Sequence, residues 1–545
     1  MTKRYTSAHA LVDTLIKAGI TEGTCVPGES YLPVLDALKQ REGAFKLYTC
    51  RQEGGAATMA EAMGRLNGKP GVCFVTRGPG ATNASIGVHN AKQNGTPMLL
   101  FIGQVARGHM GREAFQEVDF ETMFAPLAKW AVELRDGART GEIIAQAIRV
   151  ATSGRPGPVV ISLPEDVLVE DCADDLSAPY LAPKPVPEQA QVDAIVERLK
   201  AAQKPLILVG GISFDAPSAA RLTRLAEEAH IPIVTAFRRQ SLIDHRSPAY
   251  AGVLGLGPDP KLVAKVEAAD CILALGTRLG DIVTQSYELF EEGVELGKLI
   301  HVTEETQDIG RVFVPSLGLA CPSSAFVNGL GDLKGVNRQK WFETARQDYL
   351  DFRASKPEGL KLNPANVFET LRRITPDDII ITNGAGNFSI WAHRYFPLHS
   401  FNSQLGPVSG AMGYALPAAL GAAALGRTAV AVTGDGDFMM TVQELATAAH
   451  HGLKVIVLVL NNGMFGTIRM HQEKHYPGRV SATDLSNPDF AALARAHGLN
   501  GISLDSDEEI ESMLQEALNA ETSTVIELKC DPQQLTPALR IKKQP

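Results

Sequence analysis

The sequence predicts an α/β fold made of three doubly wound domains, each built on a parallel sheet. Its 545 residues exceed what one hydrophobic core accommodates, and domain sizes of about 100–200 residues predict several units. Short apolar runs alternate along the chain with Ala-rich stretches, which is the pattern of parallel sheets covered by helices on both faces. The runs fall into three successive blocks, so we expect three domains.

The first block spans residues 1–180. Its apolar runs at 45–50, 71–78, 96–104 and 157–164 predict strands that are buried on both faces. A proline-spaced segment follows at 181–191. Because each proline removes a hydrogen-bond donor and restricts the residue before it, this segment predicts an extended linker.

The second block spans residues 190–335, with apolar runs at 205–211, 231–237, 270–277 and 299–305. A polar segment at 337–362 separates it from the third block, which spans residues 360–545. The third block has apolar runs at 378–384, 428–436, 454–462 and 523–530. No short repeat of fixed period is visible, so a solenoid is not supported.

The composition argues against several functional classes. Fifty-two basic and 61 acidic residues give a net charge of −9, which provides no global positive field for nucleic acid or an anionic membrane. No apolar run reaches the roughly 18 residues of a membrane span, and the start lacks the apolar core of a signal peptide. Seven cysteines without a CxxC pair predict reduced thiols. We expect a cytoplasmic protein that acts on a small molecule.

The strongest local pattern is a pair of polar clusters, GDGDF at 434–438 and NN at 461–462, each at the end of an apolar run. Open parallel sheets bind ligands at the carboxyl ends of such strands. The glycines let the backbone approach a phosphate, while Asp435 and Asn462 offer the hard oxygen ligands that Mg²⁺ prefers, with a backbone carbonyl near Met464 completing the shell. Each cluster alone is more often only a turn or a strand end, but the pair at this spacing favours a phosphate and metal site.

This pair of clusters resembles the signature of the thiamine-diphosphate enzymes. The similarity extends from about residue 8 to about residue 530 and is strongest to the acetohydroxyacid (acetolactate) synthase-like group. It implies a pyrimidine-binding domain, a central domain and a diphosphate-binding domain, with thiamine diphosphate and Mg²⁺ as cofactors. Glu53 follows the run at 45–50 and matches the activating glutamate that hydrogen-bonds the pyrimidine ring. Without the resemblance, it is a charge that balances the dipole of a helix start.

The resemblance assigns cofactor contacts to residues in both terminal blocks: Gly28, Pro79, Asn83, Gly384, Asn387, Gly410, Met412, Gly434, Asp435, Gly436, Asp437, Phe438, Asn462, Met464 and Phe465. Met412 matches the bulky residue that bends the cofactor, although an isolated methionine is commonly a packing residue. Gln116, within the stretch 115–117, and Lys129 follow the synthase pattern near the active site, as does the stretch 276–281.

Three positions depart from the synthases. Glu29 follows Gly28 where the synthases carry small residues, and His471 stands where they carry a substrate-selecting tryptophan. Glu29 and His471 are therefore candidate catalytic residues with Gln116, although a lone histidine is more often structural. In the central block, Gly210-Gly211 and the stretch 254–257 resemble flavin contacts, but Cys321 begins a segment that departs from the flavin pattern. The sequence leaves FAD undecided.

The implied reaction is the decarboxylation of a 2-keto acid, with ligation of the remaining fragment to a second carbonyl. The alternatives are a 2-keto acid decarboxylase without ligation and an FAD-linked oxidoreductase of pyruvate-oxidase type. A plain dinucleotide enzyme is disfavoured because no GxGxxG motif follows a predicted strand. The resemblance implies that Glu53 of one chain meets the diphosphate site of another, and therefore a homodimer at least, with a dimer of dimers as the alternative. Glu29 and His471 predict a neutral acceptor such as an aldehyde, and slow acetolactate synthesis.

Overall fold

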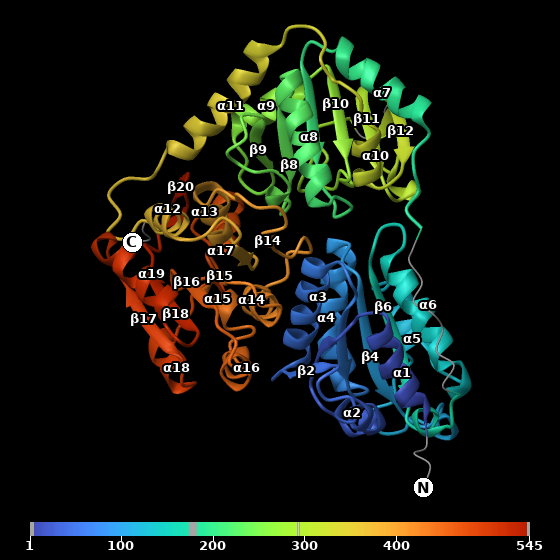
Figure 1. Ribbon diagram of the computed structural model, residues 1–545. Coiled ribbons are helices and arrows are strands. Elements are labelled where there is room, and N and C mark those ends of the chain that lie inside the picture. Colours follow the sequence, from blue (N-terminus) through green and yellow to red (C-terminus); the bar gives the residue numbers. More distant parts are fainter. Residues whose placement is uncertain (1–4, 174–182, 292, 294, 542–545) are drawn as a thin grey trace.

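The computed structural model describes residues 5–173, 183–291, 293 and 295–541 (Figure 1). It contains three six-stranded sheets whose strands are all parallel, each flanked by helices. The predicted fold class is therefore confirmed. The linker predicted at 181–191 begins outside the described residues, and so does the end of the first block at residue 180.

The N-terminal sheet has the strand order β2-β1-β3-β4-β6-β5. Its strands are β1 (Glu22–Cys25), β2 (Lys46–Thr49), β3 (Gly71–Val75), β4 (Met98–Gln104), β5 (Trp130–Glu133) and β6 (Pro158–Pro164). Its helices are α1 (Ser7–Lys17), α2 (Leu32–Lys39), α3 (Glu53–Asn67), α4 (Pro79–Asn94), α5 (Phe120–Phe124) and α6 (Thr140–Thr152). Helices α3 and α4 begin directly after β2 and β3, so their amino ends lie at the carboxyl edge of the sheet.

The central sheet has the order β12-β11-β10-β7-β8-β9. Its strands are β7 (Pro205–Val209), β8 (Ile233–Ala236), β9 (Tyr250–Leu254), β10 (Cys271–Leu275), β11 (Glu295–Thr303) and β12 (Val314–Ala320). The helices of this region are α7 (Gln189–Ala201), α8 (Ala216–Ala229), α9 (Pro260–Ala268), α10 (Ser323–Gly329) and α11 (Gln339–Ala354). Separate hydrophobic clusters cover its two faces.

The C-terminal sheet has the order β14-β13-β15-β16-β18-β17. Its strands are β13 (Ile380–Asn383), β14 (Gln404–Leu405), β15 (Ala429–Gly434), β16 (Ile456–Asn461), β17 (Asn500–Leu504) and β18 (Thr524–Lys529). Its helices are α12 (Pro364–Ile374), α13 (Phe388–Tyr395), α14 (Ala415–Ala424), α15 (Asp435–Phe438), α16 (Glu444–His451), α17 (Gly466–His475), α18 (Phe490–Ala496) and α19 (Ile510–Asn519). A two-stranded hairpin, β19 (Gln534–Thr536) with β20 (Leu539–Arg540), follows.

The two terminal domains share one hydrophobic core. A single cluster of buried residues runs from α3 and α4 to α14 and the C-terminal sheet. Helices α3 and α14 pack closely, because a Cβ at Gly421 would lie 2.7 Å from the Met59 carbonyl oxygen. The central domain lies across both of them (Figure 1). Within one chain, the terminal domains are therefore fixed relative to each other.

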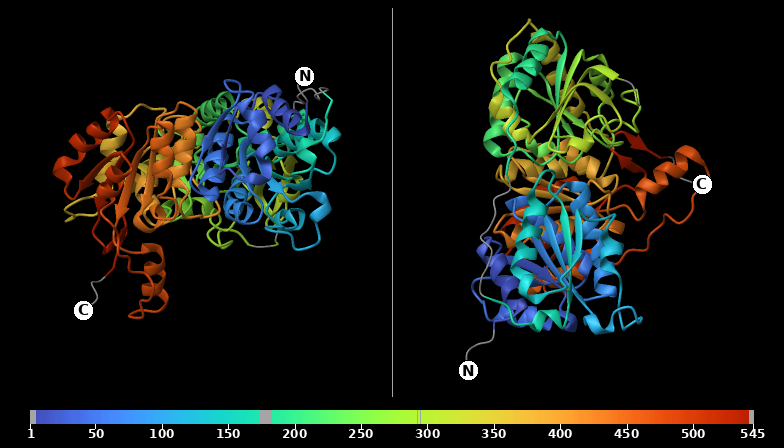
Figure 2. Two further views of the ribbon diagram at one scale, coloured as in Figure 1. Left: turned by 90° about the horizontal axis from the view of Figure 1, so that it is seen from below. Right: turned by 90° about the vertical axis from the view of Figure 1, so that its right-hand side faces the viewer.

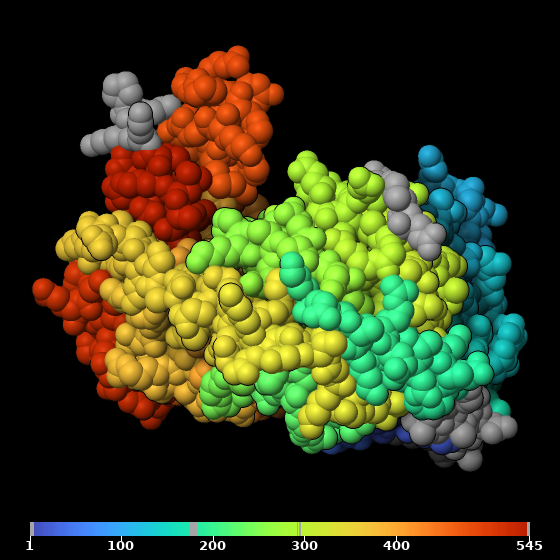
Figure 3. Space-filling model, turned by 90° about the horizontal axis from the view of Figure 1, so that it is seen from above, coloured from blue at the N-terminus to red at the C-terminus, as the bar shows by residue number. Residues whose placement is uncertain are grey.

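Helix α17 and the segment after it project from the C-terminal domain (Figure 2). The space-filling view shows the same orange part standing clear of the body of the molecule (Figure 3). Among the residues that the structure describes, no helix combines the length and apolar composition that crossing a bilayer requires.

Candidate active site

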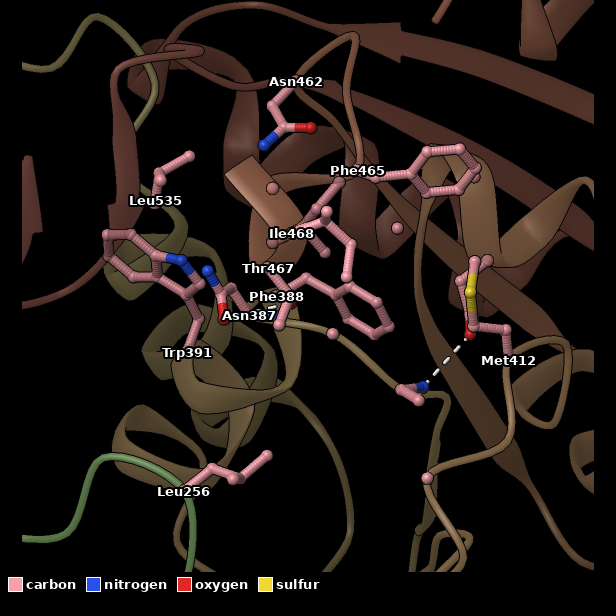
Figure 4. Close-up of a pocket in the computed structure, with 18 of the residues that line it drawn as sticks. Leu256, Asn387, Phe388, Trp391, Met412, Asn462, Phe465, Thr467, Ile468 and Leu535 are labelled. Atoms are coloured by element: carbon pink, nitrogen blue, oxygen red, sulfur yellow. Dashed lines mark hydrogen bonds between the residues drawn. The ribbon is translucent and has the colours of Figure 1, made fainter. Parts of the chain in front are cut away.

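A cavity of about 580 Å³ lies at the carboxyl ends of β13, β15 and β16. Figure 4 shows Met412 and Phe465 on one side of it, and Trp391, Leu535 and Leu256 on the other. The predicted cofactor residues that line it are Asn387, Gly410, Met412, Gly434, Asp435, Gly436, Asp437, Asn462, Met464 and Phe465. Gly384 and Phe438 are not among the described lining residues. Phe438 is buried against the Phe490 ring.

The carboxylate of Asp435 is held at one oxygen. Its Oδ2 accepts hydrogen bonds from the Gly463 backbone N–H at 2.9 Å and from Asn487 Nδ2 at 2.7 Å. Burial raises the pKa of Asp435, and these hydrogen bonds oppose that rise. Asn487 Nδ2 also donates to Asn461 Oδ1 at 3.0 Å. Asn487 thus ties together the ends of two neighbouring strands, a role that the sequence pattern did not reveal.

The two asparagines of the NN cluster have different surroundings. Asn461 Nδ2 donates to Glu527 at 2.7 Å, so its side chain belongs to the sheet. Asn462 lines the cavity, and its Oδ1 accepts a hydrogen bond from the Met464 N–H at 3.3 Å. The described part of the chain has no group of three His, Cys, Asp or Glu side chains placed to hold a metal. A cation at this site therefore depends on amide and carbonyl oxygens beside Asp435, which suits Mg²⁺.

Asp437 faces into the protein. Its carboxylate accepts hydrogen bonds from the Thr433 hydroxyl at 2.6 Å and from the N–H groups of Ala385 at 3.1 Å and Gly413 at 3.0 Å. Burial raises the pKa of Asp437 to about 6. Since these donors already use the carboxylate, Asp437 braces the loop after β13 against the loop before α14.

Close backbone packing explains two of the glycines. A Cβ at Gly384 would lie 2.0 Å from Asp437 Oδ2, and a Cβ at Gly436 would lie 2.5 Å from the Phe465 ring. The amino ends of α13 and α15 also lie at this edge of the sheet, and helix amino ends favour anions. The cavity therefore combines backbone that a phosphate can approach with oxygen ligands for a cation, and the residues fit the diphosphate and metal ion of the cofactor.

A second group of predicted residues lies in the N-terminal domain. Glu53 is the first residue of α3, and its Oε2 accepts a hydrogen bond from Asn83 Nδ2 at 2.9 Å. Gly28 packs against Thr76, since a Cβ at Gly28 would lie 2.5 Å from the Thr76 Cβ. Pro79 is the first residue of α4. Glu29 follows Gly28 and is exposed.

Gln116 has an unusual conformation in this second group. Its φ of +64° is rare for residues other than glycine. Its Oε1 is buried without a hydrogen-bond partner among the described residues. A Cβ at Gly78 would lie 2.9 Å from the Gln116 Cβ, so Gly78 gives this side chain room. The neighbouring Phe115 is largely exposed.

Within one chain, the two groups of residues do not form one site. Glu53, Glu29 and Gln116 are not among the described residues that line the cavity. Instead, Glu444 of α16 accepts hydrogen bonds from the backbone N–H groups of Arg51 and Gln52. The segment before Glu53 is thereby tied to the C-terminal domain of its own chain. His471 is exposed on α17.

A smaller cavity of about 140 Å³ lies beside the first one, and Phe237 of the central domain lines both. Arg155, Arg239 and Arg278 line the smaller one. Gly211, with φ of +69°, lies at its rim, and a Cβ there would meet the Gly276 carbonyl oxygen at 2.3 Å. Close packing of strand ends therefore explains this glycine without a ligand. Lys129 lies elsewhere and donates to the Arg155 carbonyl at 3.0 Å.

Comparisons with known proteins agree with this arrangement. Residues 5–123, 192–330 and 384–528 match the N-terminal TPP binding domain, the central domain and the C-terminal TPP binding domain of the thiamine pyrophosphate enzymes.

Full-length relatives cover nearly the whole chain. The acetolactate synthase large subunit of Parasynechococcus marenigrum is 33% identical over 96% of this chain and 87% of its own length. The mitochondrial acetolactate synthase catalytic subunit of Saccharomyces cerevisiae is 31% identical over 93% and 78%. The large subunit of acetolactate synthase isozyme 1 of Escherichia coli is 29% identical over 98% and 95%. The chain therefore belongs to the thiamine pyrophosphate enzymes, as a thiamine-diphosphate-dependent enzyme similar to the acetolactate synthases.

Proposed function

We propose that this enzyme decarboxylates a 2-keto acid with thiamine diphosphate and Mg²⁺, and ligates the remaining fragment to a second carbonyl. Thiamine diphosphate, when bound, supplies the stabilisation of negative charge that decarboxylation requires. The observation that carries the proposal is the presence of two complementary half-sites in one chain. The cavity at Asp435 suits a diphosphate with its metal, and Glu53 is a carboxylate at the amino end of a helix.

The residues of the C-terminal half-site bind and orient. Asp435 Oδ2 is occupied by two protein donors, so its Oδ1 is the oxygen that we assign to Mg²⁺. The Asn462 side chain and the Met464 carbonyl complete the protein ligands. Asn387 is the residue immediately before α13, and its backbone N–H donates to the Thr467 hydroxyl at 3.0 Å, which fixes the loop that we assign to the diphosphate. Met412 supports the cofactor from the side.

Glu53 is the carboxylate that we assign to the pyrimidine ring of the cofactor. Its assigned role is to hydrogen-bond N1′ of the bound cofactor, which would favour the tautomer of the pyrimidine ring that catalysis requires. Asn83 already donates to Glu53 Oε2, and this leaves Oε1 to face the ring. Gln116, with its unpartnered amide oxygen, is the neighbouring polar group that we assign to the substrate.

A second copy of the chain completes the site. In one chain the half-sites are separate, and exposed apolar side chains lie near both of them: Ile86 and Phe115 in the N-terminal domain, and Met439, Met440 and Ile468 in the C-terminal domain. Burying these side chains in a two-fold interface would bring Glu53 of one chain to the cavity of the other. We therefore propose a homodimer, with a dimer of dimers as the larger alternative.

The acceptor is a neutral carbonyl compound such as an aldehyde. Glu29 follows Gly28, and a negative charge there disfavours a second carboxylate in the site unless the glutamate is protonated or paired. His471, on the projecting helix α17, is the second candidate proton donor. The seven cysteines are all free thiols, which supports a reducing compartment such as the cytoplasm.

The test is a panel of 2-keto acids, incubated with the enzyme, thiamine diphosphate and Mg²⁺, with and without aldehyde acceptors. We expect CO₂ release and a ligated product when an aldehyde is present. CO₂ release without any ligated product would replace ligation with simple decarboxylation. Acetolactate formed from pyruvate alone with kcat/KM at or above about 10⁴ M⁻¹s⁻¹ would contradict the assigned acceptor.

An FAD-linked oxidation is the second candidate function. The arginine-lined central cavity supports it, because three guanidinium groups favour an anionic ligand beside the cofactor cavity. Burial lowers the pKa of Arg155 to about 10, which leaves it charged at neutral pH. This candidate predicts a yellow purified protein that consumes an electron acceptor. Full ligation activity from a colourless, flavin-free protein would rule it out.

A further inference from the structure

Arg238 belongs to the central domain, but its side chain contacts the cofactor-binding loop of the C-terminal domain. It follows β8, and its Nη2 donates to the Gly384 carbonyl at 2.9 Å. The guanidinium is buried and lines the large cavity. Its aliphatic part packs closely on the segment after β14, since a Cβ at Gly406 would lie 3.0 Å from the Arg238 Cδ.

The backbone of Arg238 is held in a conformation that arginine disfavours. Its φ is +57°, in the left-handed region. Its carbonyl accepts hydrogen bonds from Arg65 Nη2 at 3.4 Å and from Arg239 Nη1 at 3.1 Å. Residues that are held in such conformations by their surroundings cluster at functional sites.

The charge of Arg238 is incompletely compensated. Its Nε and Nη1 have no hydrogen-bond partner among the described residues. Burial lowers the pKa of Arg238 to about 9, and the charge of Asp437 opposes that change. Arg238 therefore stays protonated at neutral pH. The guanidinium also lies over the Phe237 ring at 4.8 Å, but a buried cation with two unpaired donor nitrogens is costly to a fold, so stability alone does not explain its role.

The loop at 384–387 is held from two sides. Arg238 holds the carbonyl of Gly384, and Asp437 accepts from the N–H of Ala385 and braces the same loop. The next residues, Gly386 and Asn387, line the cavity. Fixing residues 384 and 385 thus fixes the backbone that meets the diphosphate.

We propose that Arg238 is a positioning residue for thiamine diphosphate, supplied by the central domain. By holding the Gly384 carbonyl, it sets the conformation of the loop at 384–387 and so raises the affinity for the cofactor. This inference rests on the proposed function only for the identity of the cofactor.

The test compares three substitutions by calorimetric titration with thiamine diphosphate in excess Mg²⁺. Arg238→Met should weaken cofactor binding at least about tenfold, the factor expected for a lost hydrogen bond to a charged donor. Arg238→Gly should do the same while tolerating the positive φ, which guards against misfolding. Arg238→Lys keeps a cationic donor and should restore part of the affinity.

Arg338→Met is the matched control. Arg338 is a buried arginine just before α11. It donates to the backbone carbonyls of Leu199 and Leu333, and it lines neither cavity described above. It should lower stability and leave cofactor affinity within about threefold, a difference below about 0.7 kcal/mol.

Two results would overturn the proposal. One is wild-type cofactor affinity in folded Arg238→Met and Arg238→Gly, and the other is equal weakening in Arg338→Met. A wild-type protein that fails to bind thiamine diphosphate would instead contradict the proposed function, so the two failures are distinguishable.

Discussion

At the scale of single residues, the two carboxylate oxygens of Asp435 have different partners. Oδ2 is fixed by Gly463 and Asn487, while we assign Oδ1 to the metal. Asn462 is expected to supply the next ligand. Substituting either residue therefore removes one oxygen from a site that has few protein ligands.

Asp435→Ala and Asn462→Ala should each weaken binding of thiamine diphosphate at least about tenfold and make activity depend on high Mg²⁺. Titration calorimetry at two Mg²⁺ concentrations measures both effects. The control is Asp484→Ala, whose side chain is exposed and does not line the cavity, while its backbone forms an isolated β-bridge with Met464 that alanine can keep. Unchanged affinity in both test variants would place the diphosphate elsewhere.

Glu53→Gln should abolish turnover while leaving the fold and most cofactor binding intact. The amide oxygen of glutamine still accepts the hydrogen bond from Asn83, but glutamine is not a carboxylate that can shift the tautomer of the pyrimidine. Hydrogen–deuterium exchange at the reactive carbon of the cofactor measures this step directly. Glu42→Gln, an exposed position in the same domain, is the control. Exchange in Glu53→Gln within a few-fold of wild type would refute the assignment.

Residues at strand ends could be predicted from the sequence, whereas residues that act across domains could not. Asp435 and Asn462 were identifiable because each follows an apolar run. Asn487 and Arg238 contact the site across sequence separations of 52 and 146 residues. Such contacts depend on tertiary packing, and no local pattern marks them. The inward orientation of Asp437 was also not predictable, since it depends on donors from two separate loops.

At the scale of elements, the sequence predicted nearly all of the interior strands and missed most of the edge strands. The unpredicted strands β5, β9, β12, β14 and β17 are edge strands of their sheets. An edge strand needs fewer apolar residues, and β12, for example, is largely exposed or half-buried. The interior strand β1 was missed because its short segment, EGTC, is polar in composition.

The contact between α16 and the start of α3 positions Glu53. Glu444 accepts from the N–H groups of Arg51 and Gln52, and a Cβ at Gly55 would lie 2.6 Å from Glu444 Oε1. Glu444→Ala should lower the free energy of unfolding by about 1–3 kcal/mol, because it leaves two partly buried backbone donors unpaired. The turnover rate of this variant should also fall, because the same contact positions Glu53.

Glu444→Gln is the matched variant for this contact. Its amide oxygen can accept from both N–H groups, and its amide nitrogen can donate to Thr447, which now donates to Glu444. We expect stability within about 1 kcal/mol of wild type. Urea denaturation followed by circular dichroism measures both variants. Equal losses in the two would show that the negative charge, rather than the hydrogen bonds, fixes this contact.

The segment after η5 (Gln240–Leu242) makes stability depend on pH through His245. This imidazole is buried, stacks on Tyr250 at 3.9 Å and lies 3.2 Å from the Gln240 carbonyl. Burial lowers the pKa of His245 from 6.5 to about 3. Between these values the unfolded chain binds a proton and the folded protein does not. Stability is therefore fully present above pH 6.5 and decreases as the pH falls below it.

His245→Phe should reduce this pH dependence. The wild-type protein should lose about 1.4 kcal/mol of stability per pH unit below 6.5 from this group alone. Phenylalanine keeps a ring against Tyr250 and does not titrate. The stability of His245→Phe should therefore fall less steeply with decreasing pH than that of the wild type, by this amount. Urea midpoints at a series of pH values between 7 and 5 measure the difference. Parallel curves for the two proteins would show that His245 is protonated in the folded state.

At the scale of the whole molecule, the chain contains both of the half-sites that we propose for catalysis but does not bring them together. The terminal domains of one chain are fixed to each other through α3 and α14, so a small rotation cannot join Glu53 to the cavity at Asp435. The projecting helix α17 and the exposed apolar side chains near both half-sites (Figures 2 and 3) fit an interface with a second chain.

The most direct test of this account is complementation between two inactive chains, Glu53→Gln and Asp435→Ala, co-expressed with different affinity tags and purified as heterodimers. If each centre takes Glu53 from one chain and Asp435 from the other, one of the two centres in every heterodimer carries neither defect. We therefore predict about half of the wild-type turnover per dimer, while each parent homodimer stays inactive. Inactive heterodimers that still bind the cofactor would contradict the account, because they would place Glu53 and Asp435 of the same chain in one centre.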